Sequence, residues 1–259
     1  MSGPRVTEVL PGVWTAEVSL PEFAVRSVAL LGRERMLVFD TLLHPGDMSA
    51  FAGLAGNREI VTVYSHADWD HIWGTAGLPQ SGGEVVGHSA CADRFRAEVP
   101  ETLAARRAGE PGVWDDVELI APTTLFGESL ALDLDPWAVE LHHVPGHTRD
   151  SIVGWVPAAG VLLGGDVVEQ PWPLAGAGLP LDPWITALRE WALRPELRVV
   201  IPSHGAIAGP DLLERNAAYL TALRDGDDYP IPGGTDPFYA DHYAADLRRY
   251  REQPEVGTD

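Results

Sequence analysis

Short apolar runs, separated by turns and by stretches of helical spacing, recur along the whole chain. Runs rich in β-branched and aromatic residues predict strands at residues 13–18, 27–31, 36–39, 61–64, 85–86, 119–122, 124–126, 129–134, 137–142, 152–156, 160–165 and 198–201. Apolar positions at helical spacing predict helices at residues 47–55, 90–109 (broken at Pro100), 184–193, 211–224 and 239–251. Strands and helices thus alternate in two rounds, which predicts an α/β fold of two similar halves joined near residues 112–118.

Length and composition narrow the class of protein. A chain of 259 residues, 45% of them hydrophobic, can form one large domain over residues 1–259, in which we expect residues 226–259 to form a helical tail. The net charge is -20 and all 18 basic residues are arginine, so the chain repels phosphate backbones and no nucleic-acid partner is expected.

Cysteine content and apolar runs bear on location. Cys91 is the only cysteine, so no disulfide can form within the chain. We find no signal peptide and no run of 18 uncharged apolar residues, which predicts a cytoplasmic protein with no membrane partner. The sequence leaves a homodimer open.

The most informative run is residues 61–74, where a predicted strand passes directly into a polar loop. Four side chains of metal-binding type follow this strand within six residues: His66, Asp68, Asp70 and His71. Such groups held close together repel one another or are poorly solvated unless a cation lies among them. The mixture of imidazole and carboxylate indicates a transition-metal site.

Other strand ends carry residues of the same kind. His147, Asp166 and His204 each follow a predicted strand and have glycines beside them, which let the backbone approach closely. Together with the first loop this makes seven groups, too many for one zinc ion but suited to two metal ions about 3.5–4 Å apart with a carboxylate between them. Asp40 also ends a predicted strand, where an aspartate either orients its neighbours or begins a turn.

These motifs resemble the signature of the metallo-β-lactamase superfamily. The matching segments are His66-Ala-Asp-Trp-Asp-His71, Pro145-Gly-His-Thr148, Gly164-Gly-Asp166 and Pro202-Ser-His-Gly205. The resemblance covers residues 8–225 and implies a four-layer αββα sandwich with a binuclear metal site between its two sheets.

The resemblance also implies a role for each residue that matches the signature. One metal ion would be held by His66, Asp68 and His147, and the other by Asp70, His71 and His204. Asp166 would bridge the two ions together with a hydroxide that attacks the substrate. Catalytic roles are implied for Asp70, which would guide a proton to the leaving group, and for Asp40, which matches an early aspartate of the family.

Asp68 departs from the family pattern, which has a second histidine at this place. A carboxylate is a harder ligand than imidazole and carries charge, so it shifts the preference of the first site towards iron or manganese and lowers its Lewis acidity. Flavodiiron proteins are similar in having a carboxylate here, although theirs is glutamate. Alternatively, Asp68 points away and the first site is weak or empty.

Several residues near the motifs are candidates for supporting roles. His44, Trp172 and Trp184 are candidates for the substrate pocket, the two tryptophans because they border a loop at 171–183 that is rich in proline and glycine. Thr148 and Ser151 could hold the loop that carries His147 by donating hydrogen bonds.

The resemblance therefore implies a hydrolase that uses two divalent metal ions, zinc first and iron or manganese as alternatives, on a small-molecule ester, thioester or lactone. The second loop of the chain resembles that of the glyoxalase II and lactonase groups. Two other functions remain open: a diiron redox enzyme related to flavodiiron proteins, and a non-catalytic metal-binding or sensor protein of the same fold.

Overall fold

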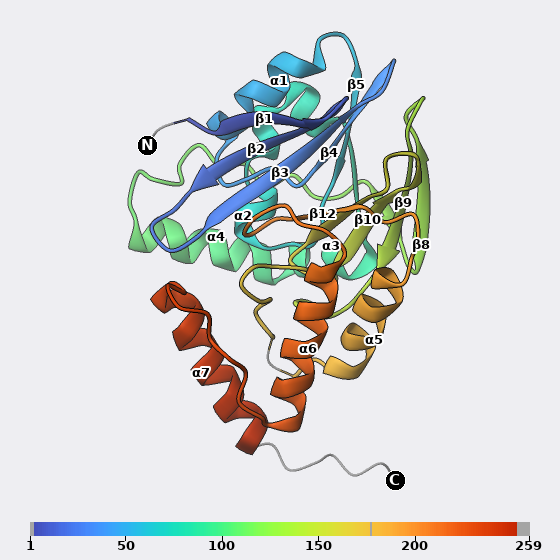
Figure 1. The fold of residues 1–259 in the computed structure, drawn as a ribbon. Coiled ribbons are helices and arrows are strands. Elements are labelled where there is room, and N and C mark those ends of the chain that lie inside the picture. Colours follow the sequence, from blue (N-terminus) through green and yellow to red (C-terminus); the bar gives the residue numbers. More distant parts are fainter. Residues whose placement is uncertain (1–2, 177, 253–259) are drawn as a thin grey trace.

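Two β-sheets pack face to face at the centre of the protein, and helices cover both outer faces (Figure 1). The structure is a computed structural model and describes residues 3–176 and 178–252. The contact between the sheets is apolar: Phe39 and Val63 of the first sheet and Leu141 and Leu163 of the second belong to one buried cluster. The αββα sandwich predicted from the sequence is therefore confirmed.

The first sheet contains seven strands of the described residues, arranged in sequence order. They are β1 (Arg5–Leu10), β2 (Val13–Ser19), β3 (Ala24–Leu31), β4 (Arg35–Phe39), β5 (Glu59–Val63), β6 (Glu84–His88) and β7 (Thr124–Phe126). Neighbours from β1 to β4 are antiparallel, and neighbours from β4 to β7 are parallel. From Ile60 to Val63, β5 is buried throughout, which explains why all four residues are β-branched.

The second sheet contains five strands of the described residues, in the order β12-β11-β10-β9-β8. They are β8 (Ser129–Asp133), β9 (Ala138–His143), β10 (Ile152–Val156), β11 (Val161–Gly165) and β12 (Val199–Pro202). β11 and β12 are parallel and the other neighbours are antiparallel. β11 and β12 therefore end at the same edge of the sheet.

The helices divide between the two outer faces (Figure 1). The first sheet packs against α1 (Ser49–Ala55), α3 (Ser89–Arg96) and α4 (Glu98–Gly109), and the second against α5 (Leu181–Ala192), α6 (Asp211–Asp225) and α7 (Pro237–Glu252). Short turns of helix lie in the connections: η1 (Pro45–Met48), α2 (Trp69–Ile72), η2 (Thr75–Gly77), η3 (Pro79–Gly82) and η4 (Pro157–Ala159). In the part of the chain that is described, no helix is long and apolar enough to cross a membrane.

Three local predictions were wrong. The helix predicted over 90–109 is two helices that separate at Ala97, whose backbone is not helical, rather than at Pro100. Pro100 lies in the first turn of α4, where a missing N–H removes no helical hydrogen bond. Residues 119–122 form no strand, and since β7 pairs with β6, the chain passes to the second sheet at residues 127–128, beyond the predicted joint at 112–118.

The predicted helical tail, 226–259, contains α7, which is two residues longer at its start than the sequence indicated. Tyr239, Tyr243 and Leu247 pack into the same apolar cluster as α5 and α6, so the tail lies against the second half of the molecule. Residues 253–259 lie outside the described part of the chain.

Candidate metal centre

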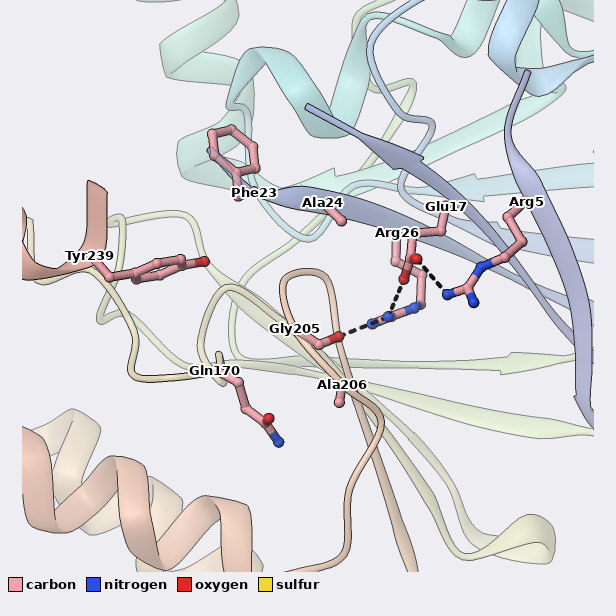
Figure 2. Close-up of a pocket in the computed structure, with 9 residues that line it drawn as sticks. All are labelled: Arg5, Glu17, Phe23, Ala24, Arg26, Gln170, Gly205, Ala206 and Tyr239. Carbon is pink, nitrogen blue, oxygen red and sulfur yellow. Dashed lines mark hydrogen bonds and ion pairs between the residues drawn. The ribbon is translucent and has the colours of Figure 1, made fainter. Parts of the chain in front are cut away.

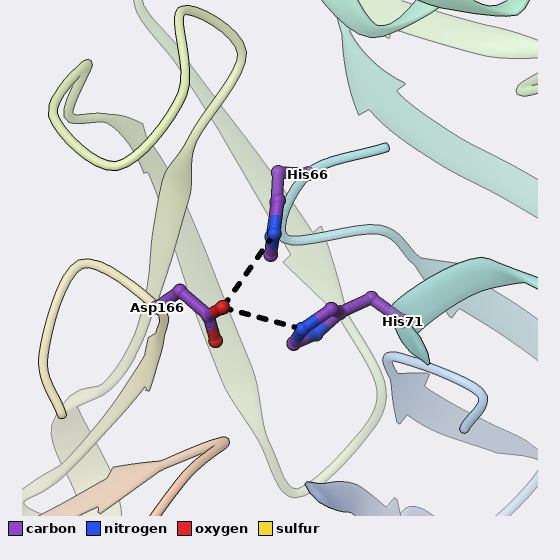
Figure 3. A group of neighbouring side chains, drawn as sticks. All are labelled: His66, His71 and Asp166. Atoms are coloured by element: carbon purple, nitrogen blue, oxygen red, sulfur yellow. Dashed lines mark ion pairs between the residues drawn. The ribbon is translucent and has the colours of Figure 1, made fainter. Parts of the chain in front are cut away.

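The predicted ligands meet between the two sheets, at the edge where several strands end. His66 follows β5, Asp166 follows β11, His204 follows β12 and His147 follows β9. Because parallel strands bring their carboxyl ends to one edge, residues far apart in sequence converge there. Figure 3 shows His66 and His71, from the first sheet's side, pointing at Asp166 from the second.

Asp166 lies at the centre of this cluster. Its Oδ2 atom is 3.4 Å from Nε2 of His71, 3.4 Å from Nε2 of His204, 3.6 Å from Nε2 of His147 and 3.7 Å from Nε2 of His66. A single carboxylate oxygen thus faces four imidazole nitrogens.

The ligand-type atoms around Asp166 form two trios. The trios are His66, Asp68 and His147, and Asp70, His71 and His204. Within them, carboxylate oxygens lie 3.3 to 3.6 Å from imidazole nitrogens. Two atoms bound to one tetrahedral metal ion at about 2.1 Å are about 3.4 Å apart, so these spacings fit a metal ion in each trio.

Unpaired buried atoms also fit a bound cation. Nε2 of His66, Nε2 of His71 and Oδ1 of Asp166 are buried and have no hydrogen-bond partner among the described residues. Leaving one such atom unpaired costs about 1–3 kcal/mol. Several of them in one cluster, all of metal-binding type, favour a cation bound among them.

The electrostatics of the cluster favour positive charge at the histidines. Burial lowers the pKa of His71, but nearby carboxylates, Asp166 foremost, raise it well above its usual value. Burial also lowers the pKa of His147, but the hydrogen bond to Asp68 and the charges of Asp166 and Asp68 together raise it to about 10. Burial lowers the pKa of His204 too, but Asp166, Glu169 and Asp70 together raise it to about 9. Without metal, the cluster therefore holds protons where cations would bind.

Asp40 holds two residues of the motif loop, Ser65 and His71, by hydrogen bonds. Its carboxylate is fully buried and accepts hydrogen bonds from the backbone N–H of Ser65 (2.7 Å) and from the Ser65 hydroxyl (2.7 Å). It also lies 2.9 Å from Nδ1 of His71. An anionic acceptor at Nδ1 keeps the proton there and leaves Nε2 free as a ligand. Asp40, predicted to be catalytic, contacts His71 and is not among the residues that line the cavity, which favours a role in orienting the His71 ring.

The loop that carries His147 is held by its own hydroxyl groups. The backbone N–H of Thr148 donates to the Ser151 hydroxyl at 3.0 Å, and the two hydroxyls are 2.8 Å apart. Nδ1 of His147 is 3.0 Å from the carbonyl oxygen of Leu174, which aims Nε2 towards Asp68. The prediction had Thr148 and Ser151 as hydrogen-bond donors; the Ser151 hydroxyl accepts from the backbone N–H of Thr148, and either hydroxyl can donate to the other.

The His204 loop is attached to the first sheet by β3. Arg26, buried on β3, donates to the carbonyl oxygens of Pro202 (2.6 Å) and Gly205 (2.7 Å), on either side of His204. Figure 2 shows the same guanidinium reaching Glu17 and Gly205. Nδ1 of His204 also lies 2.8 Å from the carbonyl oxygen of Ala24. One ligand of the second sheet is therefore positioned by the first.

A cavity of about 220 Å³ opens beside the cluster. Its lining combines potential ligands with apolar side chains and one arginine: Phe23, Asp68, Trp69, Asp70, Arg106, His147, Asp166, Glu169, Leu174, His204 and Phe238. Because Phe238 belongs to α7, the C-terminal tail forms part of the wall. Arg106 stacks over the Trp69 ring at 4.0 Å and adds a positive charge to the lining.

The residues predicted for a substrate pocket lie elsewhere. His44 stacks on Trp114 with the ring centroids 4.5 Å apart. Trp172 is buried and stacks on Tyr219, and Trp184 is buried and donates to the carbonyl oxygen of Val167 at 3.0 Å. These contacts do not favour the predicted roles, because each ring is used for packing while other residues line the cavity.

The sequence motifs did not identify three further residues that lie at the site. Arg94 of α3 donates to Asp68 at 2.5 Å and to the buried Asp150 at 3.0 Å. Glu169, 2% exposed, lines the cavity and accepts a hydrogen bond from Tyr239 of α7 at 2.6 Å. Asp150 lies in the second motif loop, but no sequence signal separated it from its neighbours.

The fold and the site together define a class of protein. A model of the metallo-beta-lactamase superfamily matches residues 20–204, well over half of the chain. The chain therefore belongs to the metallo-beta-lactamase superfamily, as its motifs indicated.

Individual relatives resemble the chain more distantly. It is 28% identical over 101 residues to a metallo-beta-lactamase type 2 from Bacteroides fragilis; the match covers 37% of this chain and only 41% of that relative. Among solved structures it is similar to the metallo-beta-lactamase FIM-1 from Pseudomonas aeruginosa in its mono-zinc form (TM-score 0.67, 22% identity, 85% of this chain and 96% of that one). It is also similar to a metallo-beta-lactamase from Pontibacter korlensis (TM-score 0.66, 20% identity, 84% and 99%). These structures share the fold.

Proposed function

We propose that this protein is a metal-dependent hydrolase that cleaves an ester, thioester or lactone bond in a small molecule. The observation that carries the proposal is the position of Asp166, one oxygen of which lies 3.4 to 3.7 Å from four histidine nitrogens. This arrangement suits two divalent ions, zinc in the first place, that share a carboxylate.

Each ligand group would have a defined place. One ion would be held by His66, Asp68 and His147, the other by Asp70, His71 and His204, and both by Asp166. When bound, the ions would polarise the scissile carbonyl and lower the pKa of a water nucleophile towards 7.

The remaining work falls to residues that line the cavity. Asp70 faces the cavity and can take the proton from the attacking water and pass it to the leaving group. Phe23, Leu174 and Phe238 exclude water from an apolar substrate. Arg106 can pair with an anionic group on the substrate. The small volume supports a small-molecule substrate.

A second candidate function rests on Asp68. A carboxylate among the ligands suits iron, and a diiron site would carry out redox chemistry with oxygen or nitric oxide. This candidate predicts iron in the purified protein, a visible absorption band, and consumption of oxygen or nitric oxide when an electron donor is supplied.

Elemental analysis followed by assays separates the candidates. Protein with two zinc equivalents that hydrolyses members of a thioester, lactone, ester, β-lactam and phosphodiester panel supports hydrolysis, and the reacting member defines the substrate class. Asp70→Asn should lower kcat by about 10²-fold or more, whereas Asp182→Asn, on the exposed side of α5, should leave it unchanged. Iron with oxygen consumption would instead support the redox enzyme, and retention of a ligand without turnover would support a sensor.

A further inference from the structure

Arg94 connects three carboxylates behind the first trio of ligands. Its side chain is only 12% exposed, and its Nη2 atom donates to Oδ1 of Asp68 at 2.5 Å. Nη1 donates to Oδ1 of Asp150 at 3.0 Å, and Nε donates to Oε2 of Glu98 at 2.8 Å. A planar guanidinium with three of its N–H groups engaged cannot rotate without breaking several hydrogen bonds.

Asp150 fixes this arrangement to the motif loop. It is fully buried, and its Oδ2 atom accepts a hydrogen bond from the backbone N–H of Ala67 at 2.9 Å. Ala67 lies between His66 and Asp68, so one carboxylate holds both the backbone of the loop and the guanidinium. The position of Arg94 relative to Asp68 is therefore set from two sides.

The two oxygens of Asp68 have different environments. Oδ1 is taken by Arg94, whereas Oδ2 lies 3.3 Å from Nε2 of His66 and 3.3 Å from Nε2 of His147. Only Oδ2 is directed at the trio. The positive charge of Arg94 lies directly against the negative charge of Asp68 and offsets part of it, since Asp150 and Glu98 share the same guanidinium.

We propose that Arg94 is a positioning residue that makes Asp68 a one-oxygen metal ligand and offsets part of its charge. The trio then carries less negative charge than one with a free carboxylate, so Asp68 weakens the Lewis acidity of this site less than an unpaired aspartate would. The proposal rests on the metal-binding part of the proposed function and not on the substrate class. It also means that Asp68 and Arg94 are exchangeable only as a pair.

A merely structural role for Arg94 predicts something different. In that case the arginine would tie α3 to the motif loop, and its loss would lower stability without changing how the first trio binds metal. Metal affinity measured separately from stability distinguishes the two roles.

The test compares Asp68→His, Arg94→Met and the double variant in the full chain. The readouts are bound equivalents of zinc, the dissociation constant of each equivalent from competition with a chelator, the visible spectrum of the cobalt-substituted protein, and the unfolding temperature. Arg94→Met should weaken one equivalent about 10–100-fold and leave the other in place, because an Asp68 that is free to rotate loses more as a ligand than its restored charge contributes. Asp68→His should weaken the same equivalent at least as much, because Asp150 and Glu98 still hold the positive guanidinium beside the metal while the carboxylate that accepted from its Nη2 atom is gone.

The double variant is the decisive measurement. Histidine at position 68 needs no neutralising partner, so the double variant should recover most of the lost affinity and show a cobalt spectrum changed from that of the unaltered protein. Strictly additive losses would overturn the proposal. Unchanged zinc affinity in Arg94→Met would overturn it as well.

Two controls keep the outcome interpretable. Arg149 also pairs with Glu98, with Nη2 donating to Oε1 at 2.6 Å, but it makes no hydrogen bond to Asp68. Arg149→Met should therefore leave the metal affinity unchanged. Arg94→Lys retains the positive charge but not the planar guanidinium with its several N–H groups. It should lose less zinc affinity than Arg94→Met, and it serves as the test if Arg94→Met folds poorly. If the unaltered protein binds no metal, the proposed function fails; if it binds two equivalents and Arg94→Met matches it, only the present proposal fails.

Discussion

The carboxylate of Asp40 and the imidazole of His71 form a pair from which solvent is excluded: both side chains are 0% exposed, and Oδ2 lies 2.9 Å from Nδ1. The contact joins the end of β4 to the motif helix α2, 31 residues further along the chain. The carbonyl oxygen of His71 also accepts a hydrogen bond from the N–H of Thr41 at 2.7 Å. One contact at the Nδ1 atom and one at the backbone carbonyl oxygen thus hold His71 in place.

Asp40→Asn should weaken metal binding. An asparagine amide that donates to Nδ1 would move the proton to Nε2 and block that atom as a ligand. We expect a loss of about 10–100-fold in zinc affinity, measured by competition with a chelator. Asp116→Asn is the control. Oδ1 of Asp116 lies 3.2 Å from Nδ1 of His44, but this carboxylate is 55% exposed and belongs to neither trio of potential ligands, so zinc affinity should not change. Equal zinc affinity in both variants would show that Asp40 does not set the tautomer.

Removal of metal should expose a pH dependence of stability. The pKa of His204 is raised to about 9 and that of His147 to about 10, against about 6.5 in the unfolded chain. Between these values the folded protein holds protons that the unfolded chain has released, so metal-free protein loses stability as the pH rises from about 6.5 to about 10.

Zinc must displace the same protons, so the increase in unfolding temperature on adding zinc should grow over that pH range. Thermal unfolding of chelated and zinc-loaded protein measures both effects. The exposed His242, changed to alanine, is the control and should leave both slopes unaltered. A metal-free protein that gains stability with rising pH in this range would contradict the prediction.

Gly74 should not tolerate a side chain. A Cβ at this position would lie 1.7 Å from the carbonyl oxygen of Thr41, which is backbone and cannot move aside easily. Gly74→Ala should therefore lower the free energy of unfolding by about 1–3 kcal/mol or more and displace the loop that ends at His71. Chemical denaturation measures the loss.

Gly53→Ala provides the matched control for that change. Gly53 lies on the exposed side of α1, and an added Cβ there would meet nothing within 4 Å. This variant should be neutral or stabilising by up to about 1 kcal/mol. Similar losses in the two variants would mean that the close approach at Gly74 is not the cause.

Tyr239→Phe should raise the pKa of Glu169, which lines the cavity, without changing the amount of bound metal. The variant leaves Glu169 with no donor to Oε1, while Oε2 already lacks a partner among the described residues. Burial already raises the pKa of Glu169 to about 7, and the tyrosine hydrogen bond opposes that rise. Its loss should raise the pKa further, so the acidic limb of the pH–activity profile should move to higher pH.

Tyr243→Phe, on the same helix, tests whether the effect belongs to the cavity. The hydroxyl of Tyr243 accepts a hydrogen bond from the N–H of Tyr229 at 2.6 Å, away from the residues that line the cavity. Its pH–activity profile should match that of the unaltered protein. Matching profiles in Tyr239→Phe and Tyr243→Phe would exclude an influence of Glu169 on the reaction.

The convergence of the motif residues could be predicted because each follows an apolar strand directly. A ligand-type residue after a buried strand lies at a sheet edge whatever the rest of the chain does, which holds for His66, Asp166 and His204. Arg94 could not be predicted in this way. It lies on α3, 26 residues from Asp68, and an arginine on a helix ordinarily indicates a solvated face.

Packing overrode local sequence signals at other positions. Trp172 and Trp184 border a loop rich in proline and glycine, which suggested a pocket wall, but contacts with α6 and with Val167 bury them in the core. Pro100 suggested a helix break, but the first turn of α4 accommodates it. Such outcomes depend on neighbours distant in sequence, which a local pattern does not contain.

The chain passes from the first sheet to the second at residues 127–128, and every trio of potential ligands contains two residues from before that passage and one from after it. A half-molecule made by truncation or by partial gene duplication would inherit a sheet and some donor atoms but no complete coordination set. The capacity to bind metal in this way therefore belongs only to the joined molecule, because neither sheet with its own loops supplies a complete trio.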